Sequence, residues 1–168
     1  MTGSESPLSG ARVLSLRGPR LLAADDLAAE LAAGRGPGSA QAVLVALAEQ
    51  LANRTRPVID AIEEELDAFE EALVDESTPV PSAARISGVR RRAIGLRRHL
   101  APQRDAMVRL HGANEAGLDE RERLALRETA DRVTRYVEDL DAARERGSVT
   151  HEEVAERLSL RTNRIMYL

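Results

Sequence analysis

The sequence contains no cysteine, no lysine and no tryptophan, and aromatic residues make up only 2% of it. Without cysteine, disulfides and thiolate zinc sites are excluded. A core with so few aromatic side chains must be built from Ala, Leu, Val and Ile, which suits closely packed helices better than a sheet sandwich. The formal net charge of -4 provides no overall basic field that would recruit nucleic acid.

Long apolar segments are also absent. Residues 1–10 lack the apolar centre of a signal peptide, and no run approaches the ~20 apolar residues that cross a bilayer, so we expect the chain as given to be soluble. No Ser/His/Asp order is recognisable, and Gly34–Gly38 lacks the Lys-Ser/Thr ending of a phosphate-binding loop. These absences predict a protein that is not an enzyme.

What is present divides the chain into three regions. The Ser-, Gly- and Pro-rich residues 1–10 predict a disordered start. Residues 11–38 predict a small αβ segment, in which Ala11–Leu16 alternates like a strand, and Asp25 caps a short helix that runs to Ala33 and ends at Gly34. Residues 39–168 predict a long-helix domain, so the fold class is mainly α.

Three long helices are predicted in the third region, at about 39–74, 83–110 and 119–168, and short loops make their neighbours antiparallel. Each helix carries one apolar stripe at spacings of three and four residues. The first stripe is Leu44, Leu47, Leu51, Thr55, Val58, Ile62, Leu66, Phe69 and Leu73. The third keeps one heptad register through Leu126, Ala130, Val133, Val137, Leu140, Arg144, Gly147, His151, Val154 and Leu158.

Several residues test the continuity of these helices. Pro57 and Pro102 fall inside the first and second helix, but the apolar pattern keeps its phase across each, so each helix is expected to continue. Asp119 and Glu122 resemble a capping box that opens the third helix. Gly147-Ser148 offers a competing break there, and the unbroken heptad register favours one continuous stalk helix.

Opposite charges crowd the first two long helices. Acidic residues gather near the end of the first helix and arginines along the second. The acids are Glu63, Glu64, Glu65, Asp67, Glu70, Glu71, Asp75 and Glu76; the arginines are Arg85, Arg90, Arg91, Arg92, Arg97, Arg98 and Arg104. The favoured interpretation is a helical hairpin in which the two charges offset each other. Attraction of cations by the acids and binding of phosphate or nucleic acid by the arginines remain alternatives.

The candidate metal ligands are Asp139, Asp141, His151 and Glu152 on the third long helix. None of the three histidines stands in a paired ligand spacing. One chain cannot close a metal site from these four residues, but several copies of the helix around an axis can.

A family resemblance comes from the second and third helices. Arg90–Asp105 resembles the Arg-rich helix of CorA-type divalent-cation transporters, and Leu100–Asp105 is similar to the zinc-transporting ZntB branch in particular. Asp131–Leu140 resembles the start of the family's stalk helix, and Arg161–Met166 resembles the segment where that stalk enters the membrane. The resemblance covers about residues 11–168. The family's two transmembrane helices, its Gly-Met-Asn signature and most of its N-terminal α/β domain are not found in this sequence.

The resemblance implies a cytoplasmic regulatory and scaffolding fragment of a transporter in the bacterial inner membrane. It implies a funnel of five identical subunits, in which the third helix continues into the missing first transmembrane helix and Asn163 lies at the cytoplasmic mouth of the pore. Divalent cations, Zn2+ or Mg2+, are the expected transported or regulatory ligands, with no permanently bound cofactor. No nucleic acid partner is expected, and contact with the membrane runs only through the missing helices.

Two other functions stay open at the level of the sequence. The chain can be a helical interaction or signalling module with no ion function. It can also be a nucleic-acid-binding bundle that uses Arg85–Arg104, although no aromatic residue interleaves these arginines.

Overall fold

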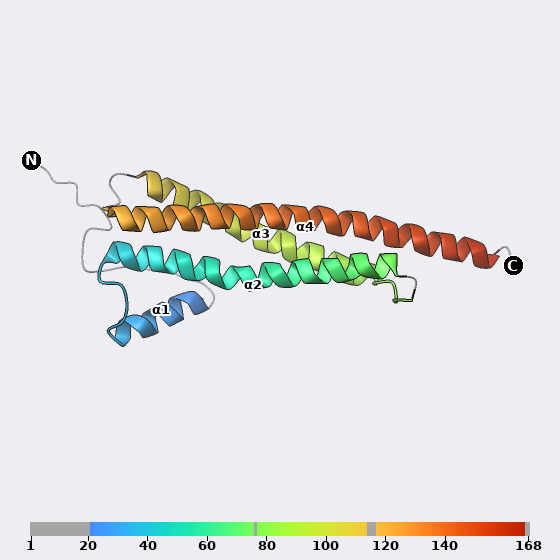
Figure 1. The fold of residues 1–168 in the computed structure, drawn as a ribbon, viewed down its shortest axis with the longest axis horizontal. Coiled ribbons are helices and arrows are strands. Elements are labelled where there is room, and N and C mark those ends of the chain that lie inside the picture. The colour runs from blue at the N-terminus through green and yellow to red at the C-terminus, as the bar shows by residue number, and fades with distance from the viewer. Residues whose placement is uncertain (1–20, 76, 114–116, 167–168) are drawn as a thin grey trace, which may run out of the picture. The chain divides into compact units, whose positions relative to one another are not determined.

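The computed structural model describes residues 21–75, 77–113 and 117–166, with side chains up to residue 160. Within these residues the chain forms four helices, α1 (Leu22–Ala32), α2 (Ala40–Val74), α3 (Ala83–Gly112) and α4 (Glu120–Met166), and no strand (Figure 1). The prediction of a mainly helical chain is confirmed. The predicted disordered start and the strand at Ala11–Leu16 lie outside the described residues, so the αβ remnant stays a prediction.

The three long helices are uninterrupted at the proline and glycine residues that could have broken them. α2 continues through Pro57 and α3 through Pro102. α4 has 47 residues and passes Gly147-Ser148 unbroken, so the predicted continuity is confirmed. The chain nevertheless divides into two compact units: unit 1 extends to Thr55 and includes Pro102–Thr134, whereas unit 2 comprises Arg56–Ala101 and the chain from Arg135 onward. The division therefore falls beside both prolines, each of which removes a backbone donor from its helix.

Unit 1 contains α1 and the adjoining ends of the three long helices. α1 ends as predicted at Gly34, which has φ +70. The amide of Arg35 donates to the carbonyl of Glu30 at 3.0 Å and that of Gly34 to Leu31 at 3.1 Å, a Schellman arrangement that satisfies two terminal carbonyls. The predicted cap at Asp25 is wrong, because α1 begins one turn earlier, at Leu22, and places Asp25 in its first turn.

The start of α4 is fixed by side chains. The amide of Glu122 donates to Asp119 Oδ1 and the amide of Asp119 donates to Glu122 Oε2, both at 2.8 Å. This is the predicted capping box, which satisfies two backbone donors at once. Ser39 similarly accepts the amide of Ala42 at 2.9 Å, and its hydroxyl donates to Glu122 Oε1 at 3.0 Å. One carboxylate thus serves the helix starts of both α2 and α4.

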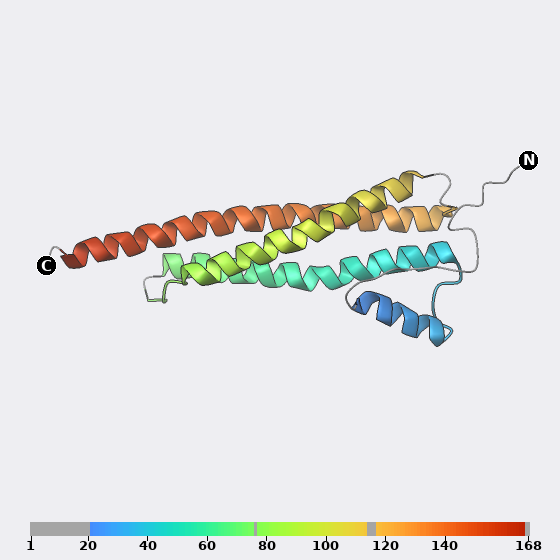
Figure 2. The same cartoon turned by 180° about the vertical axis from the view of Figure 1, so that it is seen from behind.

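Unit 2 packs α2, α3 and α4 side by side, with α3 antiparallel to the other two (Figure 2). Its core is a column of aliphatic residues with one phenylalanine. Fully buried members include Ile59, Ile62, Leu66, Ile86, Val89, Leu140 and Val154. Each such side chain contributes ~1.5–3 kcal/mol by leaving water. This core sets the faces that α2, α3 and α4 turn outward.

The predicted stripe of α2 is right from Ile62 onward and wrong before it. Ile62, Leu66, Phe69 and Leu73 are buried, but Val58 is 48% exposed and its neighbour Ile59 is fully buried. Before the proline, Ala40 is buried, as are Val45, Ala48 and Ala52, each of these three one residue after a predicted leucine. Small alanines lie at this helix contact and the leucines flank it, so the largest apolar residues do not mark its centre.

Candidate functional site

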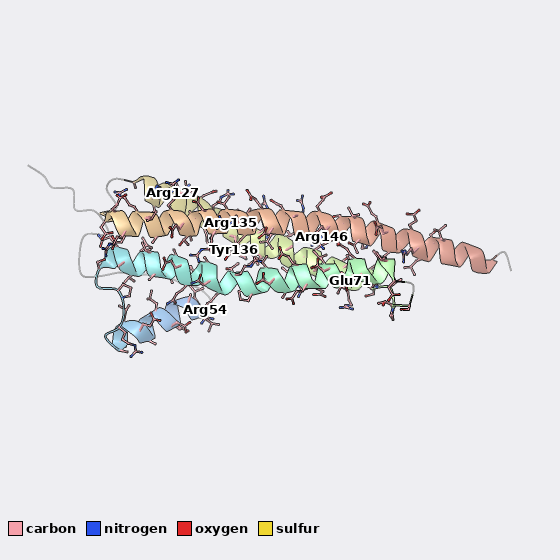
Figure 3. All side chains as sticks on the ribbon, viewed as in Figure 1. Arg54, Glu71, Arg127, Arg135, Tyr136 and Arg146 are labelled. Atoms are coloured by element: carbon pink, nitrogen blue, oxygen red, sulfur yellow. The ribbon has the colours of Figure 1, made fainter. Side chains whose placement is uncertain are left out.

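Acidic residues of α2 face α4 in unit 2, and Arg146 of α4 joins them. Its guanidinium donates to Asp67 Oδ1 at 2.5 Å and to both carboxylate oxygens of Glu70 at 2.8 Å. These hydrogen bonds raise the pKa of Arg146 far above its ordinary value, with Glu70 the larger cause. One turn later, the buried hydroxyl of Thr150 donates to the carbonyl of Arg146 at 2.8 Å. Figure 3 labels Arg146 on α4.

A second cluster surrounds Arg56. Its guanidinium lies 2.5 Å from Asp60, 3.6 Å from Glu63 and 3.5 Å from Asp139, so one positive charge faces three carboxylates. Burial raises the pKa of Glu63, and the nearby negative charge of Asp139 raises it further, while Arg56 lowers it. The predicted ligand Asp139 is therefore already engaged with α2.

The predicted ligand Asp141 points to a different helix. Its Oδ1 lies 2.7 Å from Nε of Arg97 on α3. The N–H of Arg97 is not aligned for a hydrogen bond, so the contact is an ion pair without directional bonding. Since Asp139 pairs with α2 and Asp141 with α3, the two carboxylates do not converge within one chain.

The remaining predicted residues are spread along α4. His151 is half-buried and Glu152 is exposed, and Asn163 lies in the last turns of α4, beyond the described side chains. Within the part of the chain with described side chains, no three His, Asp or Glu residues are arranged to hold a metal ion. A metal site made from these residues of several copies remains a prediction.

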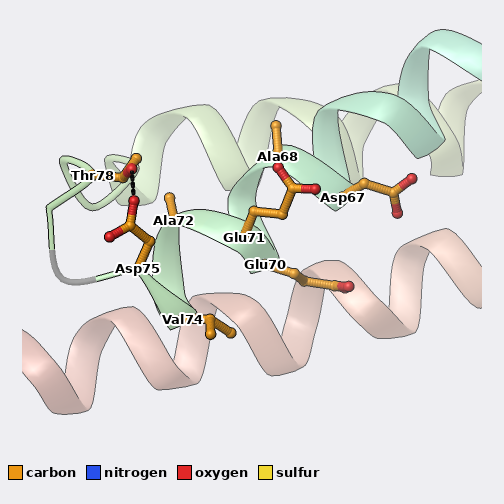
Figure 4. Close-up of a pocket in the computed structure, with 8 residues that line it drawn as sticks. All are labelled: Asp67, Ala68, Glu70, Glu71, Ala72, Val74, Asp75 and Thr78. Carbon is orange, nitrogen blue, oxygen red and sulfur yellow. Dashed lines mark hydrogen bonds between the residues drawn. The ribbon is translucent and has the colours of Figure 1, made fainter.

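The end of α2 carries an open acidic groove. It is lined by Asp67, Ala68, Glu70, Glu71, Ala72, Val74, Asp75 and Thr78 (Figure 4). Asp75 accepts hydrogen bonds from the amide and hydroxyl of Ser77 and from the hydroxyl of Thr78, which lower its pKa, with Thr78 the largest cause. The groove includes the two acids that pair with Arg146, and sequence spacing alone did not distinguish it from the rest of the acidic run.

The arginines of α3 do not all pair across the α2–α3 hairpin. Arg92 and Arg85 contact Glu65 of α2, and Arg85 also lies 5.1 Å from the ring centre of Phe69. Arg97 instead pairs with α4, and Arg146 of α4 takes two of the acids expected to face α3. The predicted charge offset is thus divided between two helix contacts.

The chain belongs to the CorA family, because the family described as CorA-like Mg2+ transporter protein matches residues 7–168. The resemblance drawn from the sequence is thereby confirmed. This is a family of cation transporters, not of enzymes. Within the described residues, none of the four helices has a stretch apolar and long enough to cross a membrane.

Two curated relatives match nearly the whole of this chain. The divalent cation transporter CmaX of Pseudomonas aeruginosa is 40% identical over 157 residues, which are 94% of this chain and 47% of CmaX. The zinc transport protein ZntB of Pectobacterium carotovorum subsp. carotovorum is 32% identical over 155 residues, 92% of this chain and 47% of that protein. The chain therefore spans about half the length of the curated relatives it matches.

Solved structures agree with the sequence comparison. The structure of full-length CmaX superimposes with a TM-score of 0.79 at 38% identity, covering 89% of this chain and 46% of CmaX. The crystal structure of the ZntB cytoplasmic domain from Vibrio parahaemolyticus has a TM-score of 0.69 at 23% identity, covering 83% of this chain and 54% of that domain. The second likeness concerns the fold alone.

Proposed function

We propose that this chain is the cytoplasmic helical part of a divalent-cation transporter of the bacterial inner membrane, with a scaffolding and regulatory role. The observation that carries the proposal is the CorA family match over residues 7–168, together with relatives named as transporters of divalent cations and zinc. In the parent transporter, α4 is the stalk that leads into the pore-lining helix. Asn163, in the last turns of α4, lies at the pore mouth.

The proposed assembly is a homo-oligomer, a pentamer in the parent transporter, with copies of α4 around one axis. Such an arrangement brings the copies of each residue to one level, with Asp139 and Asp141 at one level of α4 and His151 and Glu152 ~18 Å further along it. Carboxylate and imidazole ligands suit Zn2+, and carboxylates with water suit Mg2+. A cation bound there has to compete with Arg56 for Asp139 and with Arg97 for Asp141, so occupancy depends on cation concentration.

The test compares solution mass and thermal midpoint with and without millimolar Zn2+ or Mg2+. We expect either cation to change at least one quantity, and the paired substitutions Asp139→Asn and Asp141→Asn to remove the change. Asp131→Asn, at an exposed position of α4, is the matched control and keeps it. Arg97→Gln frees Asp141 and strengthens the response. If millimolar cation alters neither mass nor midpoint, the chain has no regulatory cation site.

A further inference from the structure

Packing within the chain does not require glycine at two positions inside α3, Gly88 and Gly95. A Cβ added at Gly88 or at Gly95 meets nothing within 4 Å. Gly147 of α4 differs, because a Cβ there would lie 2.6 Å from Cγ of Arg90. A glycine in a helix interior costs ~1 kcal/mol relative to alanine. The smooth outer surface of α3 is therefore unexplained by packing within unit 2.

The same outer face of α3 carries two arginines without partners. Arg91 and Arg98 are exposed, and among the described residues no hydrogen bond or ion pair reaches them. With the glycines they form a stripe, Gly88, Arg91, Gly95 and Arg98, which we term the basic stripe. Its spacing of three, four and three residues keeps all four on one face of the helix, opposite the buried face that contains Val89 and Ala93.

α2 of unit 2 carries a stripe of opposite charge and identical spacing. Ala61, Glu64, Ala68 and Glu71 are all exposed, and we term them the acidic stripe. Among the described residues, neither Glu64 nor Glu71 has a hydrogen bond or ion pair. In Figure 4, Ala68 and Glu71 point away from α4, whereas Glu70 lies on the side nearer to it.

The two stripes match in both charge and geometry. On each stripe the charged residues are seven apart, which is about 10.5 Å at 1.5 Å per residue, so two Arg–Glu pairs form in one register. Small residues alternate with the charges on both stripes and permit a close approach of the helix backbones. Each stripe also borders a surface groove: Gly88 and Arg91 line one, and Ala68 and Glu71 line the other.

We propose that the basic stripe of one copy of this chain docks on the acidic stripe of the next copy. The proposal rests on the self-association proposed above and specifies its contact surface. Because each copy offers two different stripes, the contact is heterologous, and repetition closes a ring if the rotation between copies allows it. A second copy is the favoured occupant because its acidic stripe reproduces the spacing of the basic stripe. Binding of nucleic acid to the basic stripe would give Glu64 and Glu71 no role.

The test exchanges the charges on one stripe at a time. Arg91→Glu with Arg98→Glu makes both stripes acidic, and Glu64→Arg with Glu71→Arg makes both basic. We expect each double variant to raise the dissociation constant for self-association at least ten-fold at low salt, in a chelator without added cation. An equimolar mixture of the two double variants regains self-association in sedimentation, because opposite stripes are again available between the two. A ring of five then keeps one like-charged contact, since two alternating variants cannot fill an odd number of positions. The quadruple variant also self-associates.

Two further variants separate this contact from general charge effects and from packing. Arg127→Glu with Arg144→Glu changes the net charge as much as the reversal on α3, at exposed positions of α4, and keeps the wild-type mass. Gly95→Leu places a large side chain on the basic stripe and weakens association without lowering helicity. Association of wild-type chains that neither stripe reversal alters would overturn this interface and leave the proposed assembly standing. A chain that remains monomeric at all concentrations, with and without cation, would overturn both, while the family assignment is unaffected.

Discussion

Replacement of Gly147 by alanine tests the packing of α3 against α4 most directly. Gly147 is buried in the middle of α4, and the side chain of Arg90 passes over it. A Cβ at residue 147 would lie 2.6 Å from Cγ and 3.3 Å from Cδ of Arg90, and 3.6 Å from Cδ2 of Leu66. The Cγ is the first atom of the arginine stem beyond Cβ, so it cannot yield without rotating the whole side chain.

Two opposing effects set the change in the free energy of unfolding that Gly147→Ala causes. Alanine in place of glycine stabilises a helix by ~1 kcal/mol. Overpacking of a filled contact costs about 1–3 kcal/mol. In the wild type the overpacking offsets or exceeds the helix gain, so Gly147→Ala is neutral or destabilising by up to ~2 kcal/mol. In an Arg90→Ala background the obstructing atoms are absent, and Gly147→Ala stabilises by ~1 kcal/mol.

The decisive quantity is the coupling between residues 90 and 147 in a double-mutant cycle, measured by urea unfolding followed by circular dichroism. We expect about 1–3 kcal/mol of coupling, the overpacking cost itself. Gly95→Ala, at a position with open space, is the control and stabilises the dissociated chain whether or not Arg90 is present. Coupling below ~0.5 kcal/mol between residues 90 and 147 would refute the contact, because independent sites add to within that margin.

Three other perturbations have defined outcomes. Asp119→Ala removes one half of the capping box with Glu122 and should lower the free energy of unfolding by about 0.5–2 kcal/mol, visible as a lower urea midpoint; an unchanged midpoint would contradict the cap. Arg146→Met should destabilise by about 1 kcal/mol at low salt, and the difference from wild type should shrink in 1 M NaCl; a salt-independent difference would assign the effect to packing instead. Because the raised pKa of Glu63 makes its ionisation unfavourable in the folded state, Glu63→Gln should stabilise at neutral pH. That gain should fade as the pH falls through the Glu63 pKa, because protonated Glu63 no longer places a charge in a partly buried site and no longer repels Asp139. A gain that persists in acid would exclude this origin.

The helices were predictable because their signals are local. The Asp119–Glu122 capping box and the stop at Gly34 each involve residues within a few turns of one another. The pairing of Arg146 with Asp67 and Glu70 was missed, because these residues are 79 and 76 positions apart. Such a pair depends on the parallel packing of α2 and α4, which no local spacing encodes.

The stripe of α4 shows a second limit of periodicity. The predicted heptad positions from Leu126 to Leu140 are buried, but Arg144 is exposed and the neighbouring Ala143 is buried. An α-helix has 3.6 residues per turn and drifts by ~20° per heptad against a repeat of 3.5. Beyond Leu140 the contact includes Ala143 and Thr150, each one residue before a predicted position, while the predicted positions Gly147 and Val154 stay buried and His151 is only half-buried. Of the predicted metal ligands, only His151 belongs to this stripe, and the role of the whole set remains a prediction.

The end of α2 is completed by a residue from elsewhere in the chain. α2 has no basic residue in its last turn, and the guanidinium of Arg157, 84 residues downstream, donates to the carbonyl of Leu73. A terminal turn held in this way frays only when α4 moves aside. Amide protons near Leu73 should therefore exchange with solvent at the rate of those around Val154. A pulling force along α4 would act first on the last turn of α2.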